Sequence, residues 1–303
     1  MDAQRSLRRQ ISCNGIGLHS GNKVNLTLKP APADFGIRFR RTDLGDHEVP
    51  ATVQNLNGIQ LATGLQRNEV SVETVEHLLA ALVSVGIDNV IVELNSPEVP
   101  IMDGSAAPFL YLIQEAGVKR LQAPRKYLKI VRPISISRGD KRIALYPSDS
   151  FKVTYSISYD HPLLRHQHRT LTITEESFAE DIAPARTFTF LKDVEMLRQN
   201  GLALGGSLEN AIVLGETGVL NALRFDDEFV RHKILDAVGD LALVGYPVIG
   251  HLVAHRAGHA LHTEFATKIL EEASAWRLVE SPTEGAIAPI PAGVKHVVPR
   301  LAR

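Results

Sequence analysis

The sequence predicts a two-domain protein that mixes β-strands with α-helices, and three observations support this prediction. The chain has 303 residues, a length that suits two domains of average size or one large α/β domain. Hydrophobic residues make up 44% of it and charged residues 22%, which is typical of a folded protein. A short polar stretch with a proline, Gln122–Arg125, separates two sets of strands and helices. We therefore favour two domains with a boundary in that stretch.

Periodic patterns predict the elements of the first half in chain order. Apolar and polar residues alternate over 23–32 and over 89–104, which predicts strands that end at proline or glycine. Residues 72–87 have helical periodicity and then a glycine, which predicts a helix that stops there. A second helix is predicted over 108–121. The first half therefore combines strands and helices.

The second half starts again with strands and ends with helices. The predicted strands are 126–139, 141–149, 151–162 and 247–255. The predicted helical segments are 175–185, 229–241 and 260–276. The end of the chain holds four prolines and no clear periodicity, so we expect a loosely ordered, Pro-containing tail over 279–303.

The two halves resemble each other around one helix each. Residues 76–94 and 231–255 both contain a helix that opens on a histidine, then a glycine and then an apolar strand. This similarity concerns supersecondary structure and is not a sequence repeat. If the two domains share a fold and face each other, the two helices present His77 and His232 to the interface.

Composition argues against several classes of function. Lys and Arg total 33 and Asp and Glu total 34, so the chain lacks the basic field that attracts nucleic acid. The single cysteine, Cys13, allows no intramolecular disulfide and no multi-cysteine zinc site, and it suits a reducing compartment. No apolar run is long enough for a secretory signal or a membrane span. We expect a cytoplasmic protein without stable membrane insertion, in which His, Asp or Glu would bind any metal.

Three polar residues follow one stripe of the predicted helix 229–241. His232, Asp236 and Asp240 are spaced four residues apart, and residues at this spacing differ by about 40° around a helix. His232 and Asp236 are therefore placed to bind one cation, although an isolated pair of this kind is more often a hydrogen-bonded pair at an interface. Asp240 is too far along the helix to join Asp236 on the metal easily, so it is better suited to orienting a histidine.

The other half of the chain supplies a third candidate ligand. Glu76 and His77 are adjacent at the start of a predicted helix. In H-E-x-x-H enzymes, a glutamate beside a ligating histidine takes the proton from water. Two histidines and one carboxylate, here His77, His232 and Asp236, are the set expected of a catalytic zinc that keeps one position open. Hard metals prefer more oxygen ligands.

A third cluster of histidines lies at the start of the last predicted helix. Gly258 permits a tight turn, and His259 follows it at the head of the helix. A protonated imidazole there could donate to a leaving group or to a developing oxyanion. His255 and His262 lie nearby, and the residues alone leave these alternatives open.

The chain resembles the zinc-dependent UDP-3-O-acyl-N-acetylglucosamine deacetylases of lipid A biosynthesis. The resemblance covers roughly Ser12–Trp276 and rests on the motifs TVEHLLAAL, PIMDGSAAPF, ARTF, LGGS, EFVRHKILDAVGDL and GHAL, in this order and spacing. It implies an α+β fold with two domains of similar topology, each a mainly antiparallel sheet with helices, and with the helices sandwiched between the two sheets. The implied domains are 1–122, with a small β insert near 40–68, and 127–278, with a β-α-β insert near 190–219.

The resemblance also implies an activity and a cofactor. The activity is hydrolysis of the 2-acetamido group of UDP-3-O-acyl-N-acetylglucosamine, which releases acetate and UDP-3-O-acyl-glucosamine in the committed step of lipid A biosynthesis. The cofactor is one zinc ion per chain, held by His77, His232 and Asp236. Glu76 would be the base that activates water.

Further roles are implied for residues around these ligands. His259 would be a protonated partner with Asp240 behind it, and Thr187 would lie at the oxyanion. The implied substrate contacts are Lys233 and Phe188 with the sugar and phosphate, Leu191, Val194, Leu208 and Val213 with the acyl chain, and His19 near the site. The stretch Tyr159–Pro162 is a candidate for the uridine pocket.

Two other functions remain open at this point. A different zinc amidohydrolase or peptidase could use the same ligands, and it would turn over substrates without a nucleotide. A non-catalytic binding protein could use its Glu-His and His-Asp pairs only to bridge two domains, and it would bind no metal. We expect a monomer whose partner is the acylated UDP-sugar, and the sequence leaves the acyl-chain length open.

Overall fold

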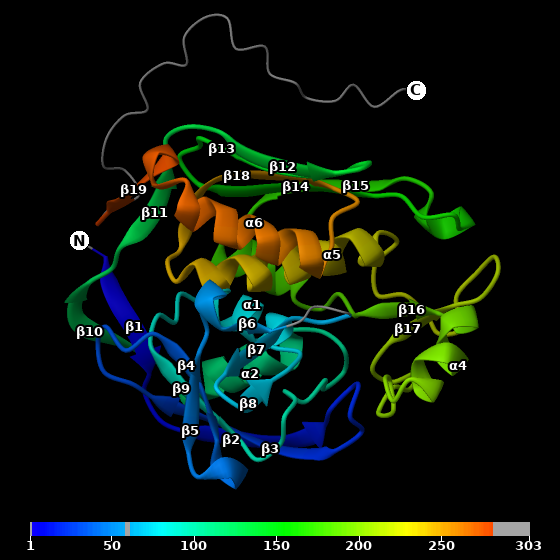
Figure 1. Ribbon diagram of the computed structural model, residues 1–303, viewed down its shortest axis with the longest axis horizontal. Helices are drawn as coiled ribbons and strands as arrows, with labels where there is room; N and C mark the ends of the chain where they lie inside the picture. The colour runs from blue at the N-terminus through cyan, green and yellow to red at the C-terminus, as the bar shows by residue number, and fades with distance from the viewer. Residues whose placement is uncertain (1, 58–60, 281–303) are drawn as a thin grey trace, which may run out of the picture.

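Two β-sheets enclose a layer of helices (Figure 1). The computed structural model describes residues 2–57 and 61–280. The first sheet has five strands in the order β2-β3-β9-β4-β5, and only the β4–β9 pair is parallel. Its strands are β2 (Ile11–Ile16), β3 (Lys23–Pro30), β4 (Ile37–Arg41), β5 (His47–Pro50) and β9 (Val90–Leu94).

The second sheet has seven strands and is built around β18. Strand β18 pairs with β13 in antiparallel fashion and with β11 and β14 in parallel. The strands are β11 (Tyr127–Ile130), β12 (Ile134–Arg138), β13 (Lys141–Tyr146), β14 (Phe151–Ile157), β15 (Gln167–Thr172), β18 (Val248–His255) and β19 (Trp276–Val279).

Four helices fill the space between the two sheets (Figure 1). They are α1 (Glu76–Ser84), α2 (Ala107–Ala116), α5 (Glu228–Leu241) and α6 (His259–Glu271). Helix α1 packs against α5 and α2, and α5 also packs against α6. The predicted α+β fold with helices between mainly antiparallel sheets is confirmed. Among the described residues, no helix is both long and apolar enough to cross a membrane.

The central helices are buried almost all the way round. In α5 every residue except Lys233 is buried, and in α1 the first seven residues are buried. A polar group in such a position costs free energy unless it is paired. Polar side chains on α1 and α5 must therefore find partners in the surrounding chain or on a ligand.

Smaller elements flank the two sheets. Strands β1 (Ala3–Leu7) and β10 (Val118–Pro124) form an antiparallel pair, and β6 (Leu56–Asn57), β7 (Gly64–Arg67) and β8 (Val70–Val72) form a small sheet. The parallel strands β16 (Phe188–Phe190) and β17 (Ile212–Leu214) are connected through α4 (Leu191–Gln199). A short α3 (Glu175–Ser177) continues into a π-helical turn over Phe178–Ile182. The domain limits and the two inserts stay predictions.

Several element boundaries differ from the sequence prediction. Helix α2 ends at Ala116 because Gly117 has a φ of 69°, and β10 then runs to Pro124 through most of the expected polar link. Helix α6 ends at Glu271. After a short turn over Ala273–Ala275 the chain forms β19, which pairs with β11. The predicted tail begins inside β19 at Val279, and residues 281–303 lie outside the described part.

The closest approach of α1 and α5 depends on one glycine. A Cβ atom built on Gly239 would lie 2.0 Å from the carbonyl oxygen of Glu76 and 3.0 Å from its Cα. Both are backbone atoms, so no side-chain rotation relieves the clash. Gly239 thus sets the distance between the two helices that carry the predicted ligands.

We predict that Gly239→Ala lowers the free energy of unfolding by about 1–3 kcal/mol, the usual cost of overpacking a core. Urea denaturation followed by circular dichroism measures it. The matched control is Gly218→Ala, because nothing lies within 4 Å of a Cβ built there, and its effect should stay within about 0.5 kcal/mol. Equal stability of the two variants would contradict the packing argument.

Candidate metal centre and active site

The contact between α1 and α5 brings three candidate ligand atoms together. Nε2 of His232 lies 3.3 Å from Oδ1 of Asp236, and Nε2 of His77 lies 3.7 Å from the same oxygen. The two imidazole rings are 4.9 Å apart. All three side chains are buried, with at most 4% of their surface exposed. Neither helix has these three ligands alone.

The spacing and the unpaired atoms fit a metal ion. Ligands bound tetrahedrally to zinc at 2.0–2.1 Å would be about 3.3 Å from one another, close to the separations found here. Oδ1 of Asp236 is buried and has no hydrogen-bond partner within the described chain. Nδ1 of His232 lies 3.0 Å from the carbonyl oxygen of Ala185, and donation to that oxygen leaves the Nε2 lone pair free for a metal.

The charge states of the three ligands also suit a cation. Burial lowers the pKa of His77 to about 3 and also lowers that of His232, so both imidazoles are neutral. Burial opposes ionisation of Asp236, but the neighbouring His232 and Lys233 hold its pKa well below the ordinary value. The set therefore offers two neutral nitrogens and one carboxylate.

Lys233 links the carboxylate ligand to the predicted substrate residues. Its Nζ donates to Oδ2 of Asp236 at 2.7 Å and lies 5.5 Å from the centre of the Phe188 ring. Burial opposes the ammonium, but Asp236 raises the pKa of Lys233 above its usual value. The Phe188 ring is also 6.4 Å from that of His232. Lys233 and Phe188 therefore lie beside the ligand cluster.

The carboxylate of Glu76 lies between the backbone of Thr63 and the imidazole of His259. Its Oε2 accepts from the backbone N–H of Thr63 at 3.0 Å, and its Oε1 lies 3.8 Å from Nε2 of His259. Burial raises the pKa of Glu76 to about 8. A raised pKa makes a carboxylate a stronger base near neutral pH.

His259 starts α6 and faces both Glu76 and the ligands. Its Nδ1 lies 2.9 Å from Oδ2 of Asp240, and its Nε2 lies 3.6 Å from Oδ2 of Asp236. Burial disfavours the imidazolium, but the carboxylates of Asp240, Asp236 and Glu76 outweigh burial and raise the pKa of His259 to about 9. His259 is therefore a cation at neutral pH, with one N–H directed at the cluster.

Asp240 is held by Thr63, which the sequence did not single out, and by His262, which it left as an alternative to His259. The hydroxyl of Thr63 donates to Oδ1 of Asp240 at 2.5 Å, and Nδ1 of His262 lies 2.9 Å from Oδ2. The other nitrogen of His262 lies 2.9 Å from the hydroxyl of Tyr155. Because of these contacts, Asp240, His259 and His262 lie close enough together to resemble a second metal site. Since Asp240 already accepts three hydrogen bonds, we interpret this group as a hydrogen-bonded support.

Glu98 is another residue that the sequence reasoning missed. Its Oε1 accepts from the backbone N–H of His19 at 2.8 Å and from the hydroxyl of Thr74 at 3.0 Å. Thr74 has a φ of 59° two residues before Glu76, a strained conformation for a β-branched residue. Glu98 thus ties the loop of His19 to the start of α1. Burial lowers the pKa of His19, and the charge of the nearby His259 lowers it further.

The remaining predicted residues lie along the β16–α4–β17 segment. Thr187 precedes Phe188, and its backbone pairs with Gly104 and Ile212. Leu191 and Val194 line a surface hollow on α4, whereas Leu208 and Val213 do not line that hollow. Leu191 is 51% exposed and Leu208 is 49% exposed.

A buried pair of neutral histidines and a carboxylate, flanked by a basic glutamate and a cationic histidine, defines a metal-dependent hydrolase on this α+β frame. The model of the family described as UDP-3-O-acyl N-acetylglycosamine deacetylase matches residues 4–271. The chain belongs to this family, as its motifs predict.

Curated relatives agree with the family match over nearly the whole chain. The UDP-3-O-acyl-N-acetylglucosamine deacetylase of Pseudomonas entomophila (strain L48) is 50% identical over 284 residues, which is 92% of this chain and 94% of the relative. That of Syntrophotalea carbinolica is 50% identical over 282 residues, 92% of this chain and 91% of the relative. That of Idiomarina loihiensis is 49% identical over 296 residues, 96% of this chain and 97% of the relative.

We predict that Asp240→Asn lowers the pKa of His259 in the metal-free protein, because it removes the nearest anion. His259 should titrate near pH 9 in the unmodified chain and about one to three pH units lower in the variant. Titration of the imidazole resonances by NMR measures both values. Asp46→Asn, an exposed substitution outside the cluster, is the control. An unchanged pKa in Asp240→Asn would show that Asp240 does not hold the imidazolium.

Proposed function

We propose that the chain is a zinc-dependent deacetylase that hydrolyses the 2-acetamido group of UDP-3-O-acyl-N-acetylglucosamine. Its products would be acetate and UDP-3-O-acyl-glucosamine, as in the committed step of lipid A biosynthesis. The observation that carries this proposal is the arrangement of His77, His232 and Asp236 between Glu76 and His259. The curated relatives bear the name of this activity.

We propose one zinc ion per chain, bound by Nε2 of His77, Nε2 of His232 and Oδ1 of Asp236. Two nitrogens and one oxygen are a common catalytic zinc set, and softer or harder metals favour other donors. Bound there, zinc would polarise the acetamide carbonyl and lower the pKa of water in its open position. The protein contributes orientation through the Ala185 carbonyl at His232 and through Lys233 at Asp236.

Glu76 is proposed as the general base. The Thr63 N–H fixes Oε2 of Glu76, so Oε1 faces the cluster and can accept a proton from the attacking water. Burial raises the pKa of Glu76, which strengthens it as a base. Loss of a general base typically lowers a rate by 100-fold or more.

His259 is proposed as the cationic partner on the other side of the reacting carbon. With Nδ1 held by Asp240, its Nε2–H can donate to the developing oxyanion or to the leaving amine as the C–N bond breaks. Thr187 is proposed as a further donor to the oxyanion. Either His259 or protonated Glu76 could deliver the proton that the free amine needs.

Substrate contacts are proposed for residues around the cluster. Lys233 and Phe188 would contact the sugar and phosphate, and His19 would lie near them. The acyl chain would lie along Leu191, Val194, Leu208 and Val213, whose exposed apolar atoms suit a hydrocarbon. Tyr159, whose ring is 6.0 Å from that of Phe188, stays a candidate for the uridine.

We propose a cytoplasmic monomer with domains near 1–122 and 127–278.

The ligand and base assignments predict opposite effects on metal content. Glu76→Ala should retain about one zinc per chain and lose at least about 100-fold in deacetylation rate, since Glu76 is a base and not a ligand. His232→Ala should lose the zinc. Elemental analysis gives the metal content, and mass spectrometry follows acetate loss from the acylated sugar nucleotide. Tight stoichiometric zinc in His232→Ala would show that the ligand set is wrong.

The proposal also predicts a bell-shaped dependence of the rate on pH. The rate should rise as Glu76 ionises and fall as His259 loses its proton, because the two act in opposite protonation states. A bound cation repels protons and lowers both pKa values from those of the metal-free protein, about 8 and about 9. Asp240→Asn should move the alkaline limb to lower pH, since it removes an anion beside His259. A flat profile from about pH 5 to 9 would exclude this pair.

The substrate class has its own test. Incubation of the purified protein with N-acetylglucosamine derivatives that lack the nucleotide or the acyl chain should give much slower acetate release than the complete substrate. Equal turnover of amides without a nucleotide would point to a different zinc amidohydrolase.

A further inference from the structure

A cavity of about 600 Å³ lies between the two sheets at the ends of α1 and α5. Its walls include residues 83–88 around the end of α1, Val238, Leu241, Ala242 and residues 245–249 around the end of α5, and Arg5, Arg125 and Phe151. None of the proposed ligands and catalytic residues lines it. Its volume falls within the range of small-molecule sites. The cavity is therefore separate from the metal centre, which lies at the start of α1.

One end of this interdomain cavity is built around a buried guanidinium. Arg125 is 8% exposed, and its Nε donates to Oδ1 of Asp88 at 2.8 Å. Its guanidinium carbon lies 5.3 Å from the centre of the Tyr127 ring. On its other side is Gly86, where an added Cβ would lie 2.9 Å from Nη1. An ion pair, a ring and a glycine together fix this side chain in place.

The Nη nitrogens of Arg125 remain for a ligand. A side-chain hydrogen bond joins the guanidinium of Arg125 to the hydroxyl of Tyr127, but the Nη nitrogens carry four N–H groups in all and belong to a side chain that lines the cavity. A second cation, Arg5, adds to the charge: its Nη1 donates to the carbonyl oxygen of Val85 at 3.0 Å. The carboxylate of Glu175 is 3.9 Å from Arg5 but is 62% exposed. The lining of the cavity thus holds three guanidinium groups, those of Arg5, Arg38 and Arg125, and one largely buried carboxylate, Asp88, while the carboxylates of Asp149 and Glu175 are exposed.

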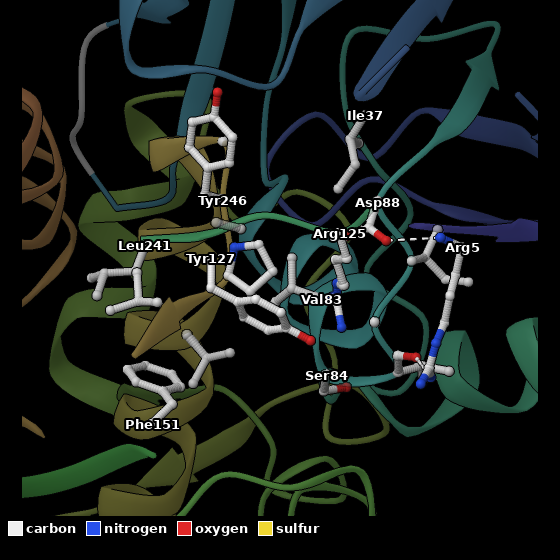
Figure 2. A pocket seen from close by; sticks show the side chains of 18 of the residues that line it. Arg5, Ile37, Val83, Ser84, Asp88, Arg125, Tyr127, Phe151, Leu241 and Tyr246 are labelled. Atoms are coloured by element: carbon white, nitrogen blue, oxygen red, sulfur yellow. Dashed lines mark hydrogen bonds and ion pairs between the residues drawn. The ribbon is translucent and has the colours of Figure 1, made fainter. Parts of the chain in front are cut away.

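The opposite end of the interdomain cavity is apolar. Figure 2 shows Phe151, Leu241 and Tyr246 on one side, Arg5, Arg125 and Asp88 on the other, and Tyr127 between them. Val238 and Ile249 also line the cavity. A ligand that satisfies both ends must combine an apolar body with one anionic group. Carboxylates suit the guanidinium because they accept two parallel N–H bonds.

We propose that the interdomain cavity is a binding site for a small amphiphilic carboxylate. The carboxylate accepts hydrogen bonds from the Nη nitrogens of Arg125, and the apolar body packs against Phe151 and Leu241. The site does not depend on the metal or on the deacetylase reaction. Either an aryl ring or an alkyl chain could pack against these apolar side chains, so the experiment compares both.

Isothermal titration calorimetry with matched ligands tests the carboxylate. The probes are 2-naphthoate and octanoate, and the controls are the corresponding neutral amides, which keep the apolar body. The better carboxylate should bind at least about 10-fold more tightly than its amide, because hydrogen bonds to a charged group are the stronger ones. Tighter binding of naphthoate than octanoate would identify an aryl ligand, and the reverse an alkyl ligand. Equal affinity of acid and amide for both bodies would overturn the proposal.

Two sets of variants locate the binding. Ala242→Phe fills the cavity, since Ala242 lines it, and should weaken binding at least about 10-fold. Ala273→Phe makes the same change at an exposed position outside it and should not alter binding. The double variant Asp88→Asn/Arg125→Gln removes the guanidinium without leaving a lone buried charge, and it should abolish the preference for the acid over the amide.

Metal removal separates this site from the metal centre, which could itself bind a carboxylate. Binding should be the same in the zinc-loaded protein and in protein stripped with a chelator. Binding that disappears with the metal but survives in Ala242→Phe would place the carboxylate at the metal centre and overturn the proposal. Retention of the acid preference in the double variant would also overturn it.

Discussion

The approach of α1 to α5 is the constraint on which the rest of the site depends. At Gly239 the two helices meet backbone to backbone, and this contact sets His77 opposite His232 and Asp236. Each helix belongs to a different half of the chain, so each half carries only part of the candidate ligand set. A change that separates the two helices should therefore disturb both the packing of the halves and the candidate metal centre.

Burial gives the cluster its chemistry as well as its stability. Because sheets cover the helices on both sides, the ionisable groups are shielded from water and their charges act strongly on one another. As a result, neighbouring groups differ in protonation state: His77 and His232 are neutral, His259 is cationic and Asp236 is an anion. The environment of each histidine, and not its residue type, decides whether it suits a metal or a proton.

The sequence predicted the stripe on 229–241 and the Glu76–His77 pair because both depend on helical spacing, which is local. It did not predict Thr63 or Glu98, since their roles depend on long-range packing: Thr63 reaches Asp240 across 177 residues. His262 was an open alternative to His259. Both contact Asp240 through Nδ1, and only the surroundings of Nε2 separate them: Tyr155 for His262 and Asp236 for His259. The stretch Gln122–Arg125 is mostly strand and not an irregular link, because pairing of β10 with β1 overrides its polar composition, while the domain boundary itself stays a prediction.

The hydrogen bond from His232 to the Ala185 carbonyl connects the candidate metal centre to the segment before β16. Ala185 lies two residues before Thr187 and three before Phe188, so one short backbone segment orients a candidate ligand and carries two candidate substrate contacts. An insertion, a deletion or a shift in this segment would therefore also disturb the geometry of His232. Residues 191–211, between that segment and β17, carry no candidate ligand. Diversification of acyl-chain preference within the family is therefore expected to concentrate there, while residues 185–188 keep their length.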